Sequence, residues 1–516
     1  FFDQWIDTDK RIDYAVVGVK HRGRDLGQEI HLRRKGSLQM PIDLQVTAQD
    51  GREYAFHIPN TWFTKSTNAT VLPRWIGWDE LQRDYTATVN IPSGIANVRI
   101  DTTYRLADAY QVNNSLRPPV EMTFDHHLYN RPDRRTYEGF VRPDLWWNGY
   151  DGTKVGVHFH GDYMRQKHKL WFTAWLNSGL GQSLPPSNTS SSFDLVKGNR
   201  DTGYDPISFN FRYENATEKL LKGSSVNVHA RLLDGLEQYG AGFNWQLKNG
   251  RTQLYAKVKL FLRRDSTDLT YLLYPDQWEL NALNSAMDVG VRHGYEYVQG
   301  DGTILFNVRN SSVGSANGYA QATLTAVNNT NLGPLDLRTR VFGQYGSGTT
   351  PRESALYLAG ANPEEMMDSK YVRSIGFVPY DWLGYGAGVN HFQQGGGLNL
   401  RGYAGYLAPE KNGDDQVIMT NYGNTGAALS AELDLDGLIN WRPGAFGRYV
   451  HLDAYLFGDV GSMGYRTTDA DGQQLYMASP RADAGFGAAL TIKKWGPLVD
   501  LKPLTIRLSQ PALSSD

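Results

Sequence analysis

Residues 252–263 read TQLYAKVKLFLR, and this segment shows the pattern that decides the fold. Its apolar residues stand at every second position, with lysine, arginine and aromatic residues between them. Because consecutive side chains of a β-strand point to opposite faces, the segment has one apolar and one polar face. It therefore predicts a strand with a different environment on each side.

The same period of two recurs in residues 153–163, 206–214, 225–232 and 334–344. The polar faces mix both charge signs with histidine and aromatic residues. This mixture favours strands that face a charged lumen over strands that form the solvent-exposed face of a soluble sandwich. Only a closed barrel can place strands in lipid, because an open edge leaves backbone polar groups unsatisfied. We expect a transmembrane antiparallel β-barrel over residues 151–516.

The alternating segments also give an expectation for the size of the barrel. Single-chain outer-membrane barrels have even strand numbers, so roughly fifteen alternating segments predict about sixteen strands, the closing strand being either absent from the chain or unresolved. The chain begins at Phe1 without an initiator methionine or a signal peptide, and we expect it to be part of a longer protein.

Composition excludes several classes of protein. The 516 residues contain 52 Lys+Arg and 54 Asp+Glu, a net charge of -2 that offers no basic footprint for nucleic acid. There is no cysteine, which excludes disulfides, thiolate catalysis and cysteine zinc sites. The mean hydropathy of -0.48 and the interrupted apolar runs exclude a transmembrane helix. Aromatic residues make up 12%, which suits the girdles of a barrel.

The N-terminal part has a different pattern of strands and turns. Residues 1–105 contain short alternating strands separated by polar turns such as Asp50-Gly51, and they predict a β-sandwich domain. Residues 106–150 are rich in Asn, Arg, Pro and Asp, and we interpret them as a linker.

The most informative motif is the run Gly395–Tyr403, GGGLNLRGY, which follows a long loop. After it come Glu432 on a polar strand face, the segment FGDVG with Asp459, and a glycine-rich strand before Gly496-Pro497-Leu498. This order resembles the BamA/TamA-type outer-membrane assembly barrels over residues 153–516. Their pattern has an Arg-Gly-Phe/Tyr loop tip, an acidic residue on the next strand, a Phe-x-Asp-x-Gly strand and a glycine-rich strand.

The resemblance implies a structural latch made of Arg401, Gly402, Tyr403, Glu432 and Asp459, with loop 347–425 folded into the lumen. A guanidinium group away from bulk water needs an anionic partner, and one such group can bridge two carboxylates. Glycine lets the loop tip turn tightly. The alternative is a solvated Arg401 in an ordinary turn beside two lumen carboxylates.

A second resemblance covers about the first 115 residues and rests on scaffold segments such as FFDQW at 1–5, RRKG at 33–36 and MPID at 40–43. These resemble the end of a Bacteroidetes aminopeptidase-N-like (gluzincin) metallopeptidase and its sandwich domain. No His-Glu dipeptide occurs in the chain, so the gluzincin zinc motif is absent. We expect no catalytic residue, metal site or cofactor in these residues, and zinc only in an upstream domain.

Other residues give weaker signals. His158, His160 and His229 fall on polar strand faces and are interpreted as lumen histidines rather than metal ligands. Trp62, Trp75 and Trp78 are interpreted as core residues of the sandwich rather than a stacking platform. Four further tryptophans are interpreted as girdle or lumen residues: Trp146, Trp147, Trp171 and Trp175.

The resemblance implies an outer-membrane protein with a periplasmic N-terminal domain and a role in protein insertion or translocation. Its implied partners are outer-membrane lipid and lipopolysaccharide, client proteins or peptides, and lipoproteins, with no nucleic acid. Two alternatives stay open. One is a membrane-anchored zinc metallopeptidase whose catalytic domain lies upstream of Phe1, so the enzymatic status is uncertain. The other is a passive channel.

Overall fold

The computed structural model describes residues 6, 8–22, 27–76, 82–125, 132–181, 206–218, 220–265, 278–359, 363–368, 397–403, 406–411, 415–438, 444–469, 472–493 and 504–515. The chain divides into two compact units. The first comprises residues 1–124, 130–140 and 161–169, and the second comprises residues 125–129, 141–160 and 170–516.

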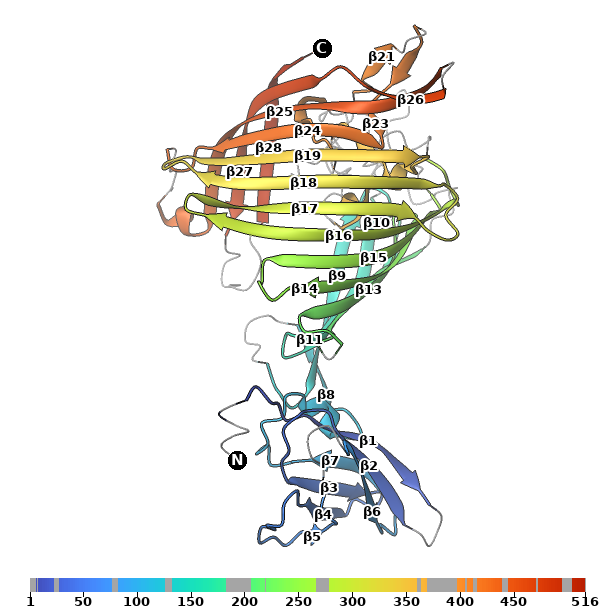
Figure 1. Cartoon of the computed structure of the whole chain (residues 1–516), viewed down its shortest axis with the longest axis vertical. Coiled ribbons are helices and arrows are strands. Elements are labelled where there is room, and N and C mark those ends of the chain that lie inside the picture. The colour runs from blue at the N-terminus through green and yellow to red at the C-terminus, as the bar shows by residue number, and fades with distance from the viewer. Residues whose placement is uncertain are drawn as a thin grey trace. The chain divides into compact units, whose positions relative to one another are not determined.

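The first unit contains two β-sheets that share one apolar core (Figure 1). One sheet has the order β1-β2-β6 and the other the order β5-β4-β3-β7. Their strands are β1 (Tyr14–His21), β2 (Gln28–Arg34), β3 (Ile42–Ala48), β4 (Glu53–Ile58), β5 (Thr70–Val71), β6 (Asp84–Val89) and β7 (Ile95–Ile100). In β3 buried side chains alternate with half-buried ones, and the buried side chains contribute to this core. Residues 14–100 thus form a two-layer all-β unit.

The segment that we expected to be a linker, residues 106–150, contains regular structure. It holds the short helix η1 (Gln111–Asn114) and the strands β8 (Val120–Phe124) and β9 (Tyr137–Asn148). The composition was misleading because Arg117-Pro118-Pro119 precede β8 and Pro132-Asp133 lie between β8 and β9, so these turn-forming residues flank the strands. Strands of the barrel sheet therefore begin before residue 151.

The large sheet closes on itself as a barrel. Its seventeen described strands follow the order β8 to β19 and then β24 to β28, and β14 to β19 and β24 run side by side across Figure 1. After β8 and β9 they are β10 (Gly152–Tyr163), β11 (Lys167–Asn177), β12 (Ile207–Ala216), β13 (Ser224–Leu233), β14 (Leu236–Gln246), β15 (Thr252–Arg263), β16 (Leu283–Tyr297), β17 (Gly300–Ser311), β18 (Tyr319–Asn331), β19 (Asp336–Gly348), β24 (Thr425–Asp434), β25 (Val450–Asp469), β26 (Gly472–Met477), β27 (Arg481–Ile492) and β28 (Leu504–Ser514).

The number of strands depends on how one position is counted. β25 pairs with β27 through residues 450–461 and with β26 through residues 464–469. β26 and β27 are thus successive segments beside the same long strand. The structure has seventeen described strands, and the sequence predicts about sixteen. The prediction that the closing strand is missing was wrong, because β8 and β9, from the segment expected to be a linker, complete the barrel.

The faces of the barrel strands are reversed relative to a soluble protein. On β15 Val258 is 44% exposed, whereas on β16 the charged Asp288 is 3% exposed. On β19 Val341 is 49% exposed beside Arg340, which is 1% exposed. Apolar side chains thus cover the outside and ionic side chains line the inside, which is the arrangement of a barrel that spans a membrane.

Short elements lie in the loop between β19 and β24. They are η3 (Arg352–Ser354), β20 (Leu356–Tyr357), α2 (Pro363–Asp368), η6 (Arg401–Tyr403), β21 (Pro409–Lys411), β22 (Val417–Met419) and β23 (Tyr422–Gly423). β20 pairs with β23, and β21 pairs with β22. A further short helix, η7 (Gly444–Arg448), precedes β25. Among the described residues, no helix has the length and apolar character needed to cross a membrane.

Candidate functional site

The guanidinium group of Arg401, in η6, lies against two carboxylates of the barrel wall. Its Nε and Nη2 donate to Oδ2 and Oδ1 of Asp459 at 2.7 and 3.0 Å, and its Nη1 donates to Oε2 of Glu432 at 3.0 Å. None of the three side chains is more than 7% exposed. The Cζ atom of Arg401 also lies 3.9 Å from the centroid of the Phe457 ring. Two charge-assisted bonds to one carboxylate fix the orientation of the guanidinium plane as well as its position.

The sheet register explains why the two carboxylates converge. In the pairing of β24 with β25, Glu432 is opposite Phe457, and Asp459 is opposite Ser430. The carboxylates are therefore diagonal neighbours on one face of the sheet, a separation that long side chains can bridge. The outward neighbours Leu429 and Val460 are 50% and 39% exposed, so the carboxylates point to the lumen.

Glu432 also pairs with a second cationic side chain. Its Oε1 accepts a hydrogen bond from Nη2 of Arg507, which comes from β28. Cζ of Arg507 lies 4.4 Å from the centroid of the Tyr455 ring. Glu432 thus stands between a guanidinium group of the loop and one of the wall, and loss of its charge would weaken the pairing of both.

The other two residues of the tip make different contacts. The Gly402 N–H donates to Oδ2 of Asp483 at 2.9 Å. A Cβ atom on Gly402 would lie 2.8 Å from Cβ of Asp483, so this close approach requires glycine. The Tyr403 hydroxyl lies 2.9 Å from the carbonyl oxygen of Ala482 and 2.6 Å from that of Ser515. The tip is thereby tied to β27 and to the residue that follows β28.

The first part of the loop has its own anchors in the lumen. In η3, Glu353 forms a buried ion pair with Arg263 of β15. In α2, Glu364 Oε2 accepts from Lys259 Nζ at 2.6 Å and from Arg309 Nη2 at 3.1 Å. These loop carboxylates had no signal in the sequence, although the arginines and lysine on inward strand positions indicated a need for anionic partners.

Residues 397–400, just before the tip, are attached to the barrel wall through a backbone carbonyl group and through buried leucines. Arg340 of β19 donates from Nη2 to the carbonyl oxygen of Gly397 at 2.7 Å. Leu398 and Leu400 are fully buried in an apolar cluster that also includes Phe342 of the wall. The described parts of loop 347–425 are therefore attached to the interior wall by ionic, backbone and apolar contacts, while residues 360–362, 369–396, 404–405 and 412–414 lie outside the described residues.

Beside the anchored loop the lumen contains a cavity of about 1180 Å³. Three of the predicted girdle or lumen tryptophans line it, namely Trp146, Trp171 and Trp175. The indole N–H of Trp147 donates to the carbonyl oxygen of Gly181 at 2.7 Å. The lining of the cavity has polar and apolar parts, with cations such as Lys257 and Lys259 among its residues.

The histidines and the N-terminal tryptophans have separate places. His158 and His229 line the lumen cavity, as their strand phase predicts. Trp75 is buried in the core of the first unit, whereas Trp62 is 87% exposed with Cζ of Arg74 3.5 Å from its ring centroid. The prediction of a core position for Trp62 was wrong, because its segment 61–69 is irregular and lies outside both sheets. Trp78 lies outside the described residues.

Neither a family model nor a curated relative matches the chain. Among solved structures it is similar to CdiB from Escherichia coli, at 12% identity, with a TM-score of 0.39, covering 73% of this chain and 59% of that one. It is also similar to the outer membrane protein OpdK from Pseudomonas aeruginosa, at 11% identity, with a TM-score of 0.33, covering 69% of this chain and 76% of that one. The chain thus spans about three fifths of the length of the CdiB structure.

Proposed function

We propose that this chain is an outer-membrane β-barrel protein that inserts or translocates other proteins, and that Arg401 is the latch of its lumenal loop. The observation that carries the proposal is the buried contact of Arg401 with Asp459 and Glu432. The closed barrel with apolar exterior and ionic interior supports its place in the outer membrane. The proposal places the first unit in the periplasm.

Physical reasoning supports a functional role for the latch. A buried ion pair is often no more stabilising than an apolar contact, so its value lies in fixing one arrangement. Here it fixes the tip of a long loop against β24 and β25, whose hydrogen-bonded register is continuous over residues 425–434. Clients of the proposed activity would be unfolded outer-membrane proteins or peptides. Its other partners would be lipid, lipopolysaccharide and lipoproteins.

The test is client folding in proteoliposomes that contain the purified chain. A urea-unfolded small barrel protein is added, and its protease-protected fraction is followed with time. We expect faster protection than in empty liposomes, and a loss of this acceleration in Arg401→Ala. The matched control is Arg251→Ala, since Arg251 forms an exposed pair with Glu296. Equal rates with and without the chain would contradict the proposal.

The lumen cavity of about 1180 Å³ favours a second candidate, a passive channel. Conductance across a planar bilayer separates the two functions. A steady open conductance without any acceleration of client folding would establish the channel. Acceleration with little or no steady conductance would support the insertion role, because the anchored loop would then close the lumen at rest.

A further inference from the structure

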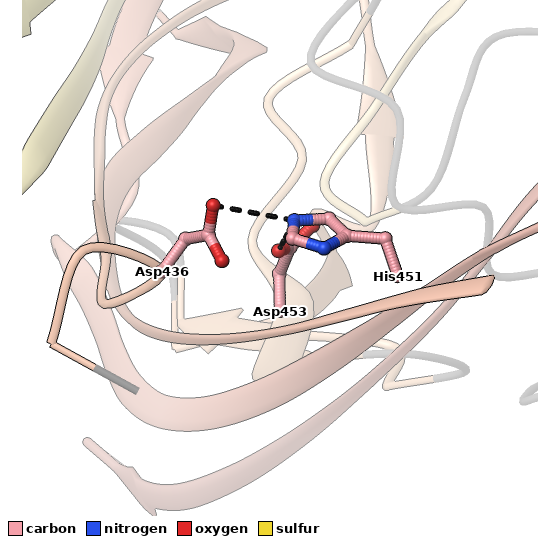
Figure 2. A group of neighbouring side chains, drawn as sticks. All are labelled: Asp436, His451 and Asp453. Atoms are coloured by element: carbon pink, nitrogen blue, oxygen red, sulfur yellow. Dashed lines mark ion pairs between the residues drawn. The ribbon is translucent and has the colours of Figure 1, made fainter. Parts of the chain in front are cut away.

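Three side chains at the turn between β24 and β25 converge on one point (Figure 2). Nε2 of His451 lies 2.5 Å from Oδ1 of Asp453 and 3.2 Å from Oδ2 of Asp436. One ligand atom from each residue lies within 4.8 Å of the other two. Figure 2 shows both carboxylates reaching the same nitrogen of the imidazole ring.

The strand register creates this group. The last ladder pair of β24 and β25 joins Asp434 to Tyr455, and the N–H of Leu435 donates to the carbonyl oxygen of Ala454 at 2.9 Å. Continuation of this register places Asp436 opposite Asp453. His451 stands two residues before Asp453, and residues two apart on a strand share a face. All three side chains are thus on the face that also carries Asp459, the lumen face.

The turn that carries Asp436 is held in place. The N–H of Asp436 donates to Oδ1 of Asp434 at 2.9 Å. The next residue, Gly437, passes so close to the β18–β19 turn that a Cβ atom there would lie 2.1 Å from the carbonyl oxygen of Pro334. The position of Asp436 is therefore set by the backbone, independently of the imidazole that it faces.

One oxygen of each carboxylate is buried and lacks a hydrogen bond, although the Asp436 and Asp453 side chains are 41% and 19% exposed. Within the described part of the chain, the buried atoms Oδ1 of Asp436 and Oδ1 of Asp453 have no hydrogen-bond partner. Oδ1 of Asp453 is nevertheless the atom 2.5 Å from the imidazole. Buried polar atoms are nearly always satisfied, so these two oxygens have the capacity to bind a cation.

The surroundings favour a cation. An adjoining cavity of about 530 Å³ has five carboxylates among its lining residues, from Asp301, Asp336, Glu432, Asp434 and Asp453. Only two guanidinium groups, Arg338 and Arg507, are among the lining residues that the structure describes. The excess of negative charge in a walled space raises the local concentration of cations. The His451 and Asp453 side chains are 17% and 19% exposed, so an ion can reach them.

We propose that Asp436, His451 and Asp453 bind one divalent transition-metal cation, with Zn²⁺ as the probe. Ligands held by one Zn²⁺ at about 2.0–2.2 Å stand roughly 3.3–3.6 Å apart in a tetrahedral shell. The 3.2 Å contact of His451 with Asp436 is close to this separation, whereas the 2.5 Å contact with Asp453 would lengthen when the ion binds. The imidazole favours a transition metal over Mg²⁺ or Ca²⁺, which prefer oxygen ligands alone. The fourth position is left to water. The ion would join the turn to β25 at the end of the barrel opposite loop 347–425.

The sequence did not indicate this site. Asp436 and His451 are separated by a turn region, and only the register brings them together. This inference does not depend on the proposed function, because it concerns neither the latch nor client proteins.

Calorimetric titration of the chelator-treated chain tests the proposal. The protein carries no polyhistidine tag, and Zn²⁺ is added at about pH 7.5, where an ordinary imidazole is neutral. We expect saturable binding of one equivalent. Bound Zn²⁺ should raise the unfolding temperature, since a ligand of the folded state stabilises it. Co²⁺ in the same site should give a visible absorption band that Zn²⁺ abolishes.

The variants His451→Gln and Asp436→Asn should each weaken Zn²⁺ binding at least ~10-fold, because even partners outside the ligand shell change affinity by that factor. Two controls are matched to them. His293→Gln removes an exposed imidazole elsewhere, and Asp301→Asn removes one charge from the same cavity. Both should bind Zn²⁺ as the unchanged chain does.

Three results would overturn the proposal. One is the absence of saturable binding near one equivalent, which would leave contacts between the three side chains as the role of the group. Another is unchanged affinity in both ligand variants. The third is an equal loss of Zn²⁺ affinity in Asp301→Asn, which would mean that the acidic cavity attracts Zn²⁺ without a specific site. If His451→Gln does not fold, Asp436→Asn and the Co²⁺ spectrum of the unchanged chain decide the outcome.

Discussion

Arg401 and Asp459 are 58 residues apart in the chain, and the guanidinium group donates two hydrogen bonds of 2.7 and 3.0 Å to the carboxylate. Asp459 is 3% exposed and Arg401 is 7% exposed, so bulk water cannot solvate either charge if the ion pair is broken. The contact connects a loop residue to a strand of the barrel wall. A change on either side therefore affects both the folding of the wall and the placement of the loop.

Arg401→Ala should destabilise the barrel by about 3–5 kcal/mol, because it leaves two buried carboxylates without their shared cation. Arg401→Lys should recover only part of this, since an ammonium group cannot reproduce the two parallel bonds to Asp459. The measurement is the temperature at which the folded band on a denaturing gel converts to the unfolded band. Arg251→Ala is the control and should change stability by less than about 1 kcal/mol. An unchanged conversion temperature in Arg401→Ala would count against the latch.

Gly402→Ala should lower the free energy of unfolding by about 1–3 kcal/mol, because the added methyl group would overlap the Asp483 side chain. The measurement is the midpoint of urea-induced unfolding in lipid vesicles. Gly343→Ala on β19 is the control, since a Cβ atom there would have no neighbour within 4 Å. Equal midpoints for the two variants would show that the tip does not need its close approach to β27.

Glu364→Gln should loosen the part of the loop that contains α2, while the barrel wall stays folded. Arg309 keeps its pair with Asp288, whose Oδ1 and Oδ2 lie 2.6 and 2.9 Å from its Nε and Nη2. We expect larger or more frequent conductance steps in a planar bilayer, with an unchanged unfolding temperature. Asp368→Asn is the control, because Asp368 in the same helix is 71% exposed in its pair with Arg231. Identical conductance in all three proteins would refute this role of Glu364.

The first unit should depend on pH through Asp108. Burial raises the pKa of Asp108 to about 6, although the Tyr14 and Tyr110 N–H groups donate to its carboxylate and oppose the shift. The folded state then holds the proton more tightly than the unfolded state. The resulting stabilisation is complete below about pH 3.8, falls as the pH rises towards 6 and is lost above it.

Amide hydrogen exchange at Tyr14 and Tyr110 checks this prediction. Relative to Asp108→Asn, the unchanged chain should lose up to about 3 kcal/mol of local protection between pH 4 and pH 7. Asp50→Asn, at an exposed turn between β3 and β4, should leave the exchange of both amides unchanged. Parallel pH profiles for the unchanged chain and Asp108→Asn would contradict the assignment.

The sequence by itself determined which face of each strand is apolar, and with it the closed barrel. This was possible because alternation is a local property: Val258 and Lys259 must point to opposite sides whatever the rest of the chain does. The resemblance of its motifs to the assembly barrels also implied Arg401, Glu432 and Asp459 as a set. Where the composition of a segment was used in place of this alternation, as in residues 106–150, the prediction of a linker failed.

Only the tertiary structure decided which side chains meet. Asp436 faces His451 because the β24–β25 register places it there, and Glu364 meets Arg309 because the loop turns back into the lumen. Neither pairing has a signature in spacing or composition. The physical reason is that strand register and loop placement are set by contacts between residues distant in the chain, whereas the period of two is set by each residue and its neighbours.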